Sequence, residues 1–204
     1  MPHKFTPKQE LELQQDLSVL ETDLRRLLRG KLISKSEINA LNIACGRADE
    51  TGVLAKIIGE KASSAHIQGL DLRASEIDYA REKWKKVLGE QTVSCDFGVG
   101  RADRLNELKE LDDPDLVFIR HQNYWFEPKA WIKLYDQALQ KLKQDGVMVI
   151  TSYFDEEHEM ARQVLSKLGA VEIEHRFNPN ARIVKDSPKV EKSVDRHISV
   201  FVKL

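Results

Sequence analysis

The chain of 204 residues has very little cysteine, and neither of its two cysteines suggests a cross-link. Cys45 and Cys95 both lie in apolar stretches typical of strands, so we expect no disulfide framework and favour a cytoplasmic protein. No apolar run approaches the roughly 20 residues that a membrane helix needs. The first residues also lack the apolar core of a signal peptide. We therefore expect no membrane association.

An excess of charge of one sign is also missing. The 32 Lys and Arg residues and 33 Asp and Glu residues leave a formal net charge of −1. Nothing in the overall charge therefore points to nucleic acid or to an anionic membrane surface as a partner. The apolar content of 41% is ordinary for a globular protein, and the length is sufficient for one domain with a normal core.

The first segment predicts one long helix. Thr6 suits the N-cap, Pro7 suits the first helical position, and Gln9 completes a capping box. Gly30 is expected to end the helix. Such a helix either packs on its own domain, which we favour, or pairs with a second copy in a homodimer. Its narrow apolar seam consists of Leu13, Leu17, Leu20, Leu24 and Leu27.

From residue 38 onward, short apolar strands alternate with amphipathic helices. Repeated strand–helix–strand units predict a mostly parallel sheet with right-handed crossovers. A polar stretch with two prolines separates the last two strands, so these are expected to run antiparallel. The predicted strands cover 40–45, 65–71, 92–99, 115–120, 146–152, 170–177 and 197–203. The predicted helices cover 49–60, 75–88, 103–111, 128–143 and 156–168, with Ser75 and Asp155 as caps.

The predicted fold class is therefore α/β. We expect a three-layer, doubly wound sheet of seven strands, parallel except for an antiparallel last strand. Residues 1–37 are assigned to an N-terminal accessory helix and residues 38–204 to the α/β domain.

The most informative stretch runs from Leu41 to Asp49, where an apolar strand leads through small residues into a helix. A second strand, Ile67 to Asp71, ends in a carboxylate. In α/β proteins such a turn presents backbone N–H groups to a ligand, and an acid after the second strand accepts hydrogen bonds from ribose hydroxyls. This arrangement predicts a site for a nucleoside-containing cofactor. The alternative interpretation is a buried strand with a tight turn, and an ordinary turn aspartate before the next helix.

The strand pattern, the final antiparallel pair and this turn resemble those of the class I S-adenosylmethionine-dependent methyltransferases. The resemblance covers residues 38–204. It implies a seven-stranded Rossmann-like fold, S-adenosylmethionine as cofactor and S-adenosylhomocysteine as product.

Within the first turn, the family pattern is an acid followed by a glycine-rich loop around Cys-Gly-x-Gly. Asn42 stands at the position of the acid, and Ala44 and Ala48 stand at two glycine positions. An amide donates and accepts hydrogen bonds but cannot pair with an ammonium group. Alanine still lets the backbone approach a ligand unless the turn requires a positive φ. The matching positions are Leu41, Ile43, Cys45 and Gly46.

The resemblance also implies where each part of the cofactor binds. The methionine portion belongs to residues 44–48, the ribose to Asp71, and the adenine to the segment near 99–103. Arg101 stands where the family has an acid for the adenine amino group. Its guanidinium can stack on adenine, or Asp103 or backbone amides can replace the acid. The residues implied to bind the cofactor are Asn42, Ala44, Cys45, Gly46, Asp71, Leu72, Arg101, Ala102 and His121.

A run of imidazole, amides and aromatics, from His121 to Phe126, follows the fourth strand. Ligands of open α/β sheets lie beyond the carboxyl ends of the strands, and in the resembled family this loop faces the transferable methyl group. The rings of Tyr124 or Trp125 attract a sulfonium cation, and His121 can deprotonate a hydroxyl or amine. We assign His121 and Tyr124 as catalytic. The alternative is that Trp125 and Phe126 anchor the next helix while His121 faces solvent.

Other polar clusters are less informative. Tyr153 and Phe154 are expected to form another wall of the acceptor pocket, and His158 is interpreted as a helix-surface residue. No group of His, Cys and Asp has the spacing of a metal site, so no metal is expected. The basic loop from Arg176 to Arg196 suits an anionic acceptor or RNA, but a solvated loop is the preferred interpretation.

Together these features predict an S-adenosylmethionine-dependent methyltransferase that acts on an oxygen or nitrogen of a small-molecule acceptor. Because Asn42 and Arg101 replace acids of the family pattern, one alternative is a non-catalytic member of the fold that binds a nucleoside ligand or a protein partner. RNA methylation is a third hypothesis.

Overall fold

A computed structural model describes residues 5–32, 34–87, 92–108, 111–122, 124–184 and 192–204. The chain divides into two compact units, Met1–Ala102 and Asp103–Leu204. The end of the helix predicted over 75–88, and the middle of the basic loop at 185–191, lie outside the described residues. In the part of the chain that is described, no helix has the length and apolar character needed to cross a membrane.

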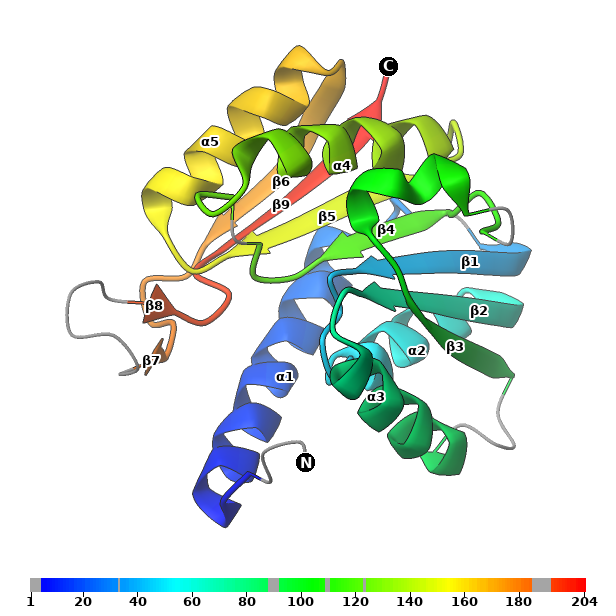
Figure 1. The fold of residues 1–204 in the computed structure, drawn as a ribbon, viewed down its shortest axis with the longest axis vertical. Helices are drawn as coiled ribbons and strands as arrows, with labels where there is room; N and C mark the ends of the chain where they lie inside the picture. The colour runs from blue at the N-terminus through cyan, green and yellow to red at the C-terminus, as the bar shows by residue number, and fades with distance from the viewer. Residues whose placement is uncertain (1–4, 33, 88–91, 109–110, 123, 185–191) are drawn as a thin grey trace. The chain divides into compact units, whose positions relative to one another are not determined.

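The first unit alternates helices and strands, as Figure 1 shows. In chain order its elements are α1 (Pro7–Leu27), β1 (Lys35–Ile43), α2 (Thr51–Gly59), β2 (Ala62–Asp71), α3 (Ala74–Val87) and β3 (Val93–Val99). β2 pairs in parallel with both β1 and β3, so the carboxyl ends of these strands meet at one edge. Helix α2 contacts β2, and α3 contacts β3.

Helix α1 begins with the predicted capping box. The Thr6 hydroxyl accepts from the Gln9 amide N–H, and the Gln9 side chain accepts from the N–H of Thr6 at 2.9 Å. The helix packs on α2, where Lys56 Nζ lies 2.9 Å from the Glu21 carboxylate. Four leucines of the seam are buried: Leu17, Leu20, Leu24 and Leu27. The seam that could have joined two copies is therefore used within one chain.

The second unit continues the alternation and ends in antiparallel strands. Its elements are β4 (Leu116–Ile119), α4 (Pro128–Lys141), β5 (Val147–Ser152), α5 (Asp155–Lys167), β6 (Ala170–Phe177), β7 (Ile183–Val184), β8 (Lys192–Ser193) and β9 (His197–Lys203). β4 and β5 are parallel, whereas β9 is antiparallel to both β5 and β6.

The sheet has seven strands in the order β3-β2-β1-β4-β5-β9-β6. It is parallel apart from β9, which confirms the predicted α/β class with an antiparallel last strand. The apolar side chains of its strands form much of the core, as in β4 and β5, where every residue is buried.

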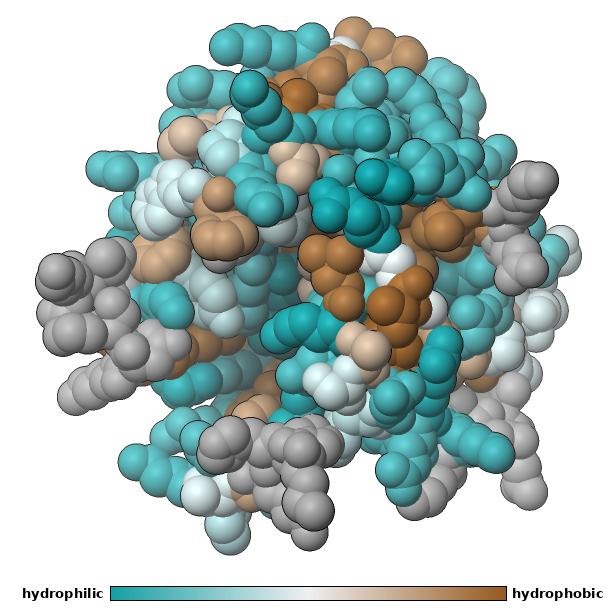
Figure 2. Space-filling model, viewed as in Figure 1, coloured by the Kyte–Doolittle hydropathy of each residue, from teal (hydrophilic) through white to brown (hydrophobic). Residues whose placement is uncertain are grey.

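Several boundaries differ from the sequence prediction. β1 begins at Lys35 and not at residue 40, because its polar first residues pair with Ala62–Ser64 through the backbone, which needs no apolar side chain. The helix predicted over 103–111 is a 3₁₀ helix over Ala102–Glu107 with a kink at Arg104. The predicted caps are wrong, since Ser75 and Asp155 lie inside α3 and α5. Hydrophilic residues dominate the face shown in Figure 2.

Candidate functional site

The turn between β1 and α2 has an unusual backbone. Ala44, Gly46 and Ala48 have φ values of 55°, 53° and 53°, in the left-handed region that only glycine adopts without a steric penalty. The turn therefore requires a positive φ at both positions where alanine replaces a family glycine. Backbone strain of this kind persists where the surrounding structure imposes it, often at binding sites.

Hydrogen bonds hold this turn against the end of β2. The Gly46 N–H donates to Asp71 Oδ2 at 2.7 Å, and the Cys45 N–H donates to the Leu70 carbonyl at 3.0 Å. The predicted turn and the predicted ribose-binding acid are thus brought together. Backbone groups, more than side chains, define the geometry of this part of the site.

The Asp71 carboxylate is already engaged by the protein. Its Oδ1 accepts from the Arg73 N–H at 2.9 Å and from Arg73 Nε at 3.0 Å, while Oδ2 accepts from Arg73 Nη2 at 3.3 Å. A carboxylate offers about four acceptor positions, and Gly46 takes the remaining one. Burial acts to raise the pKa of Asp71, but these hydrogen bonds bring it below its usual value. Ribose hydroxyls can reach this carboxylate only where Arg73 gives up its contacts. The Arg73 side chain is 62% exposed and has room to move.

A carboxylate that the sequence analysis missed lies beside Asn42. Glu50 is 4% exposed, and its Oε1 accepts from Asn42 Nδ2 at 2.6 Å. It supplies an acid next to the position where the family acid is absent. Asn42 Oδ1 is buried without a hydrogen-bond partner. Burial, followed by the charges of Glu50 and Asp71, raises the pKa of the Cys45 thiol well above its usual range. Cys45 therefore contributes backbone and not a thiolate.

Exposed apolar side chains flank Asp71. Leu72 is 62% exposed, and Val99, which pairs with Asp71 across β2 and β3, is 51% exposed. The Gly100 N–H donates to the Asp71 carbonyl at 3.0 Å, so the segment that leads to Arg101 and Ala102 begins at the same strand edge. Arg101 is exposed and Ala102 is half-buried. The residue pair Leu72 and Val99 offers apolar surface for a purine ring, and Val99 begins the segment near 99–103 that was predicted to bind the adenine.

In the second unit, His121 belongs to a buried ionic network. His121 Nε2 lies 2.9 Å from Asp195 Oδ1, and Arg120 makes a two-point contact with the same carboxylate at 3.1 and 2.6 Å. Thr151 Oγ1 donates to Asp195 Oδ1 at 2.9 Å and accepts from the His121 N–H at 3.2 Å. Burial acts to raise the pKa of Asp195, but Arg120 and His121 hold it far below its usual value.

This network fixes the tautomer of His121. The Asp195 N–H also approaches Nε2, at 3.3 Å, but the shorter, charge-assisted contact with the carboxylate requires a proton on Nε2. In the neutral ring Nδ1 is then the proton acceptor. The His121 ring lies parallel to the Tyr153 ring, with centroids 3.8 Å apart, and its backbone has a φ of 55°.

Tyr124, the other predicted catalytic residue, is only 4% exposed. Its ring is parallel to that of Tyr135, with centroids 6.4 Å apart, and burial raises the pKa of its hydroxyl. Its N–H donates to Glu157 Oε1 at 2.7 Å. Glu157 is 1% exposed, and burial raises its pKa to about 7, although the Tyr124 N–H opposes this. The structure places Tyr124 where it anchors the loop after β4.

An aromatic cavity of about 430 Å³ lies beside this loop. The rings of Trp125 and Phe154 stack with centroids 5.0 Å apart, and Tyr153, the neighbour of His121, is part of the same wall. The predicted contribution of Tyr153 and Phe154 to a pocket is thus matched by a cavity of small-molecule size. It is lined by Trp125, Tyr153, Phe154, Asp155, Glu156, Ser193 and Arg196.

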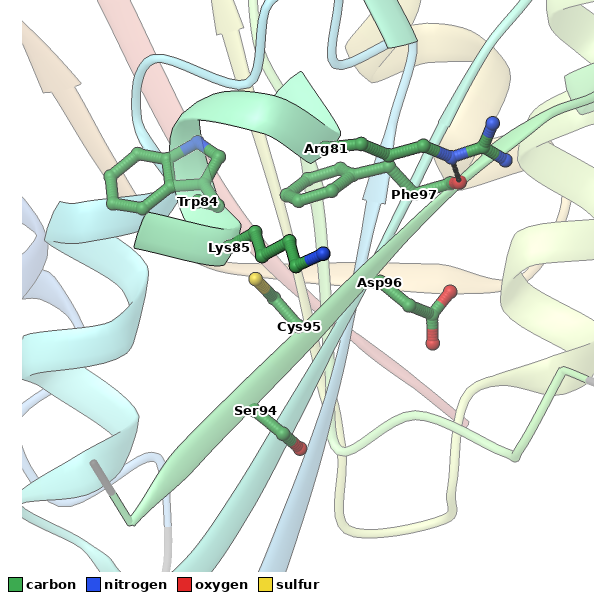
Figure 3. Close-up of a pocket in the computed structure, with 7 residues that line it drawn as sticks. All are labelled: Arg81, Trp84, Lys85, Ser94, Cys95, Asp96 and Phe97. Carbon is green, nitrogen blue, oxygen red and sulfur yellow. Dashed lines mark hydrogen bonds between the residues drawn. The ribbon is translucent and has the colours of Figure 1, made fainter. Parts of the chain in front are cut away.

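A second cavity, of about 560 Å³, lies in the first unit between α3 and β3. Figure 3 shows Arg81 and Lys85 extending from α3 toward β3, and Arg81 Nε donates to the Phe97 carbonyl at 2.7 Å. None of the predicted cofactor residues lines it. Its larger volume therefore does not make it the better candidate for the nucleoside site.

Some of these residues could have been predicted from the sequence, whereas others could not. Glu50 lies just beyond the predicted turn, so an acid directly before the helix was a usable signal. Asp195 is 75 positions from Arg120, and no local pattern connects it with the loop after β4. His158 was wrongly interpreted as a surface residue, since it is only 2% exposed.

Comparisons with known proteins agree with this geometry. A family model described as a methyltransferase domain matches residues 34–198. No curated protein gives a significant match. A precorrin-6y C5,15-methyltransferase from Geobacter metallireducens is 19% identical, with 89% of this chain and 87% of that chain covered and a TM-score of 0.64.

Two further solved structures share the fold. An S-adenosylmethionine-dependent methyltransferase from Clostridium acetobutylicum is 12% identical, with 90% of each chain covered and a TM-score of 0.62. An S-adenosylmethionine-dependent O-methyltransferase from Thermotoga maritima is 16% identical, with 100% of this chain and 68% of that chain covered and a TM-score of 0.58. The chain therefore belongs to the methyltransferase domain family, and its fold is that of the class I methyltransferases.

Proposed function

We propose that this methyltransferase transfers the methyl group of S-adenosylmethionine to an oxygen or nitrogen of a small-molecule acceptor. One observation carries the proposal: a turn with positive φ at Ala44, Gly46 and Ala48 is hydrogen-bonded to Asp71 at the carboxyl edge of the parallel strands. Such an edge is where ligands of open α/β sheets bind.

The residues of the first unit fit this cofactor. The turn offers backbone groups to the methionine portion, with the Glu50 carboxylate restoring the negative charge that Asn42 lacks. Asp71 accepts from the ribose hydroxyls after Arg73 releases it, and Leu72 and Val99 cover the adenine. When bound, S-adenosylmethionine supplies an electrophilic methyl group whose bond electrons remain on sulfur, leaving S-adenosylhomocysteine as product.

The residues of the second unit fit the acceptor side. His121 Nδ1 accepts the proton of the attacking hydroxyl or amine, while Asp195 holds Nε2 and stabilises the imidazolium that forms. The exposed ring of Trp125 gives the cavity a face that attracts a cation. Most of the rate enhancement comes from positioning the reacting groups, because methyl transfer needs no strong acid.

Calorimetry tests the cofactor assignment. The unaltered chain should bind S-adenosylhomocysteine at one site, and Asp71→Asn should weaken binding by about ten-fold or more, which is the scale of a lost charge-assisted hydrogen bond. Asp96→Asn is the matched control, because Asp96 lies on β3 and its carboxylate pairs with His66. Absence of binding at millimolar ligand would end the proposal. Equal affinities for the two variants would place the ribose elsewhere.

A transfer assay with labelled S-adenosylmethionine tests the acceptor class. We expect label to enter pools of small phenols or amines, and His121→Gln should lower kcat more than it changes cofactor affinity. Transfer to RNA alone, with binding that falls steeply as salt rises, would contradict a small-molecule acceptor.

A further inference from the structure

Three of the six histidines of the chain meet inside the second unit. His158 comes from α5, His175 from β6 and His197 from β9, and one ring nitrogen of each lies within 4.8 Å of the others. Their positions in the sequence show no metal-binding motif, so the cluster is visible only in the fold. Its residues do not belong to the cofactor turn or to the His121 network.

The His175–His197 pair already has the separation of two zinc ligands. His175 Nε2 lies 3.2 Å from His197 Nδ1. Two nitrogens bound to one tetrahedral zinc ion at about 2.0–2.1 Å are about 3.3 Å apart. Because each lone pair must then point at the ion and not at the other nitrogen, each ring has to turn by roughly 35°.

A carboxylate fixes which nitrogen of His197 is available. Asp155 Oδ1 lies 2.8 Å from His197 Nε2, and contacts with Arg196 and then His197 hold the pKa of Asp155 far below its usual value. The ionised Asp155 thus keeps the proton of His197 on Nε2 and leaves Nδ1 as the electron-pair donor. Carboxylate–histidine pairs of this kind orient metal ligands in proteins.

His158 is the third donor. Burial lowers the pKa of its imidazole to about 2, so the ring is neutral, which is the form that binds a metal. Its Nδ1 lies 2.9 Å from Ser152 Oγ and its Nε2 lies 2.8 Å from Ser199 Oγ. Metal binding exchanges the Ser199 contact for the ion and moves the ring proton to Nδ1, where Ser152 accepts it. Because the His158 ring is nearly parallel to that of His197, with centroids 4.7 Å apart, it must also turn out of this stack.

We propose that His158, His175 and His197 form a binding site for a single zinc ion. Imidazole nitrogens suit zinc and its neighbours in the first transition row better than magnesium or calcium. His175 is exposed and provides the entry path and the side on which a water molecule completes the coordination. No net proton release from the three neutral rings is required, because the protons on Nε2 of His158 and His175 move to Nδ1.

The site ties α5, β6 and β9 together and is connected to the aromatic cavity. Asp155 both orients His197 and lines that cavity.

Zinc should raise the thermal midpoint of the protein, because a ligand that binds only the folded state stabilises that state. The proposal does not depend on the identity of the methyl acceptor or on cofactor binding.

Calorimetry with Zn²⁺ on the full, tag-free chain, previously treated with a chelator, tests the proposal. We expect one ion per chain, and binding that weakens at least ten-fold in His175→Ala. This variant removes an exposed ring and should leave the fold intact. His66→Ala is the control, because His66 pairs with Asp96 and Ser94 at 2.7 Å outside the cluster.

Co²⁺ provides a second readout that depends on coordination. The unaltered chain and His66→Ala should give the visible absorption of four-coordinate Co²⁺, and His175→Ala should not. The proposal is overturned if the unaltered chain binds no stoichiometric ion, or if His66→Ala and His175→Ala bind Zn²⁺ equally well.

Discussion

The two units hold their candidate sites by different means. In the first, backbone groups define the turn after β1: the N–H groups of Cys45 and Gly46 reach the end of β2. In the second, side chains far apart in sequence define the site, since Asp195 holds both Arg120 and His121. A site built from backbone tolerates changed side chains, as Asn42, Ala44 and Ala48 illustrate. A site built from side chains should tolerate far fewer changes.

The largest expected effect is on the side-chain network. Asp195→Ala leaves Arg120, whose side chain is 9% exposed, without its partner. Removing one member of a buried ion pair costs about 3–5 kcal/mol in the free energy of unfolding. Urea denaturation should show this loss, whereas Asp96→Ala, which breaks an exposed pair, should cost under about 1 kcal/mol. A loss below about 1 kcal/mol in Asp195→Ala would remove the contrast between the units.

Glu157 gives the second unit a pH dependence that the first should not share. Burial raises its pKa from 4.5 to about 7, so between these values the folded protein retains a proton that the unfolded chain has released. Stability therefore falls as the pH rises through this window, and above pH 7 ionised Glu157 costs up to about 3 kcal/mol. Glu157→Gln should remove that cost.

Urea denaturation of Glu157→Gln at pH 4 and pH 8 checks this. The variant should match the unaltered chain at pH 4, where the carboxyl is protonated in both states, and should exceed it at pH 8. Glu156→Gln, at an exposed neighbouring position, should change neither value. A variant that is no more stable at pH 8 would show that Glu157 is not held in its neutral form by burial.

Substitution of Arg73 should have a smaller effect, on the affinity of the first unit's site for its ligand. Because Arg73 occupies acceptor positions of Asp71, Arg73→Ala should strengthen binding of S-adenosylhomocysteine by about two- to five-fold, the scale of a partly exposed ion pair. Calorimetry measures this directly, with Arg81→Ala on α3 as the control for loss of one positive charge. Weaker binding in Arg73→Ala would mean that the guanidinium contacts the ligand.

The smallest effect concerns the turn itself. Ala44 is half-buried at a φ of 55°, so Ala44→Gly should stabilise the protein by about 0.5–1 kcal/mol, the relieved strain less the added freedom of the unfolded chain. Ala55→Gly, inside α2, should instead destabilise it by about 1 kcal/mol. Thermal unfolding of the two variants should therefore show shifts of opposite sign. A shift of the same sign would mean that the turn carries no strain at Ala44.

The sequence was most informative where the residues of the candidate site lie close together along the chain. The strand from Leu41, its turn and Asp71 form a short continuous pattern, and the structure joins them through the Gly46 N–H. The alternation of strands and helices could also be predicted, because the spacing of apolar residues indicates which face of each element is buried. The start of β1 could not be predicted, because pairing through the backbone requires no particular side chains in the polar residues that precede Ile38.

The rest of the site could not be predicted because it depends on contacts between distant positions. Asp195 and His121 become neighbours only when β9 pairs with β5. The occupation of Asp71 by Arg73 depends on a side-chain conformation that neither residue type dictates. His175 and His197 meet because their strands pair antiparallel.

Hydrogen exchange in the presence and absence of S-adenosylhomocysteine tests the central claim, that the turn and Asp71 hold the cofactor, most directly. We expect slower exchange in residues 41–50 and 68–73 when the ligand is bound. No change is expected in residues 94–97, which line the cavity of Figure 3. Protection confined to residues 81–97, with the turn unaffected, would contradict it and place the nucleoside between α3 and β3.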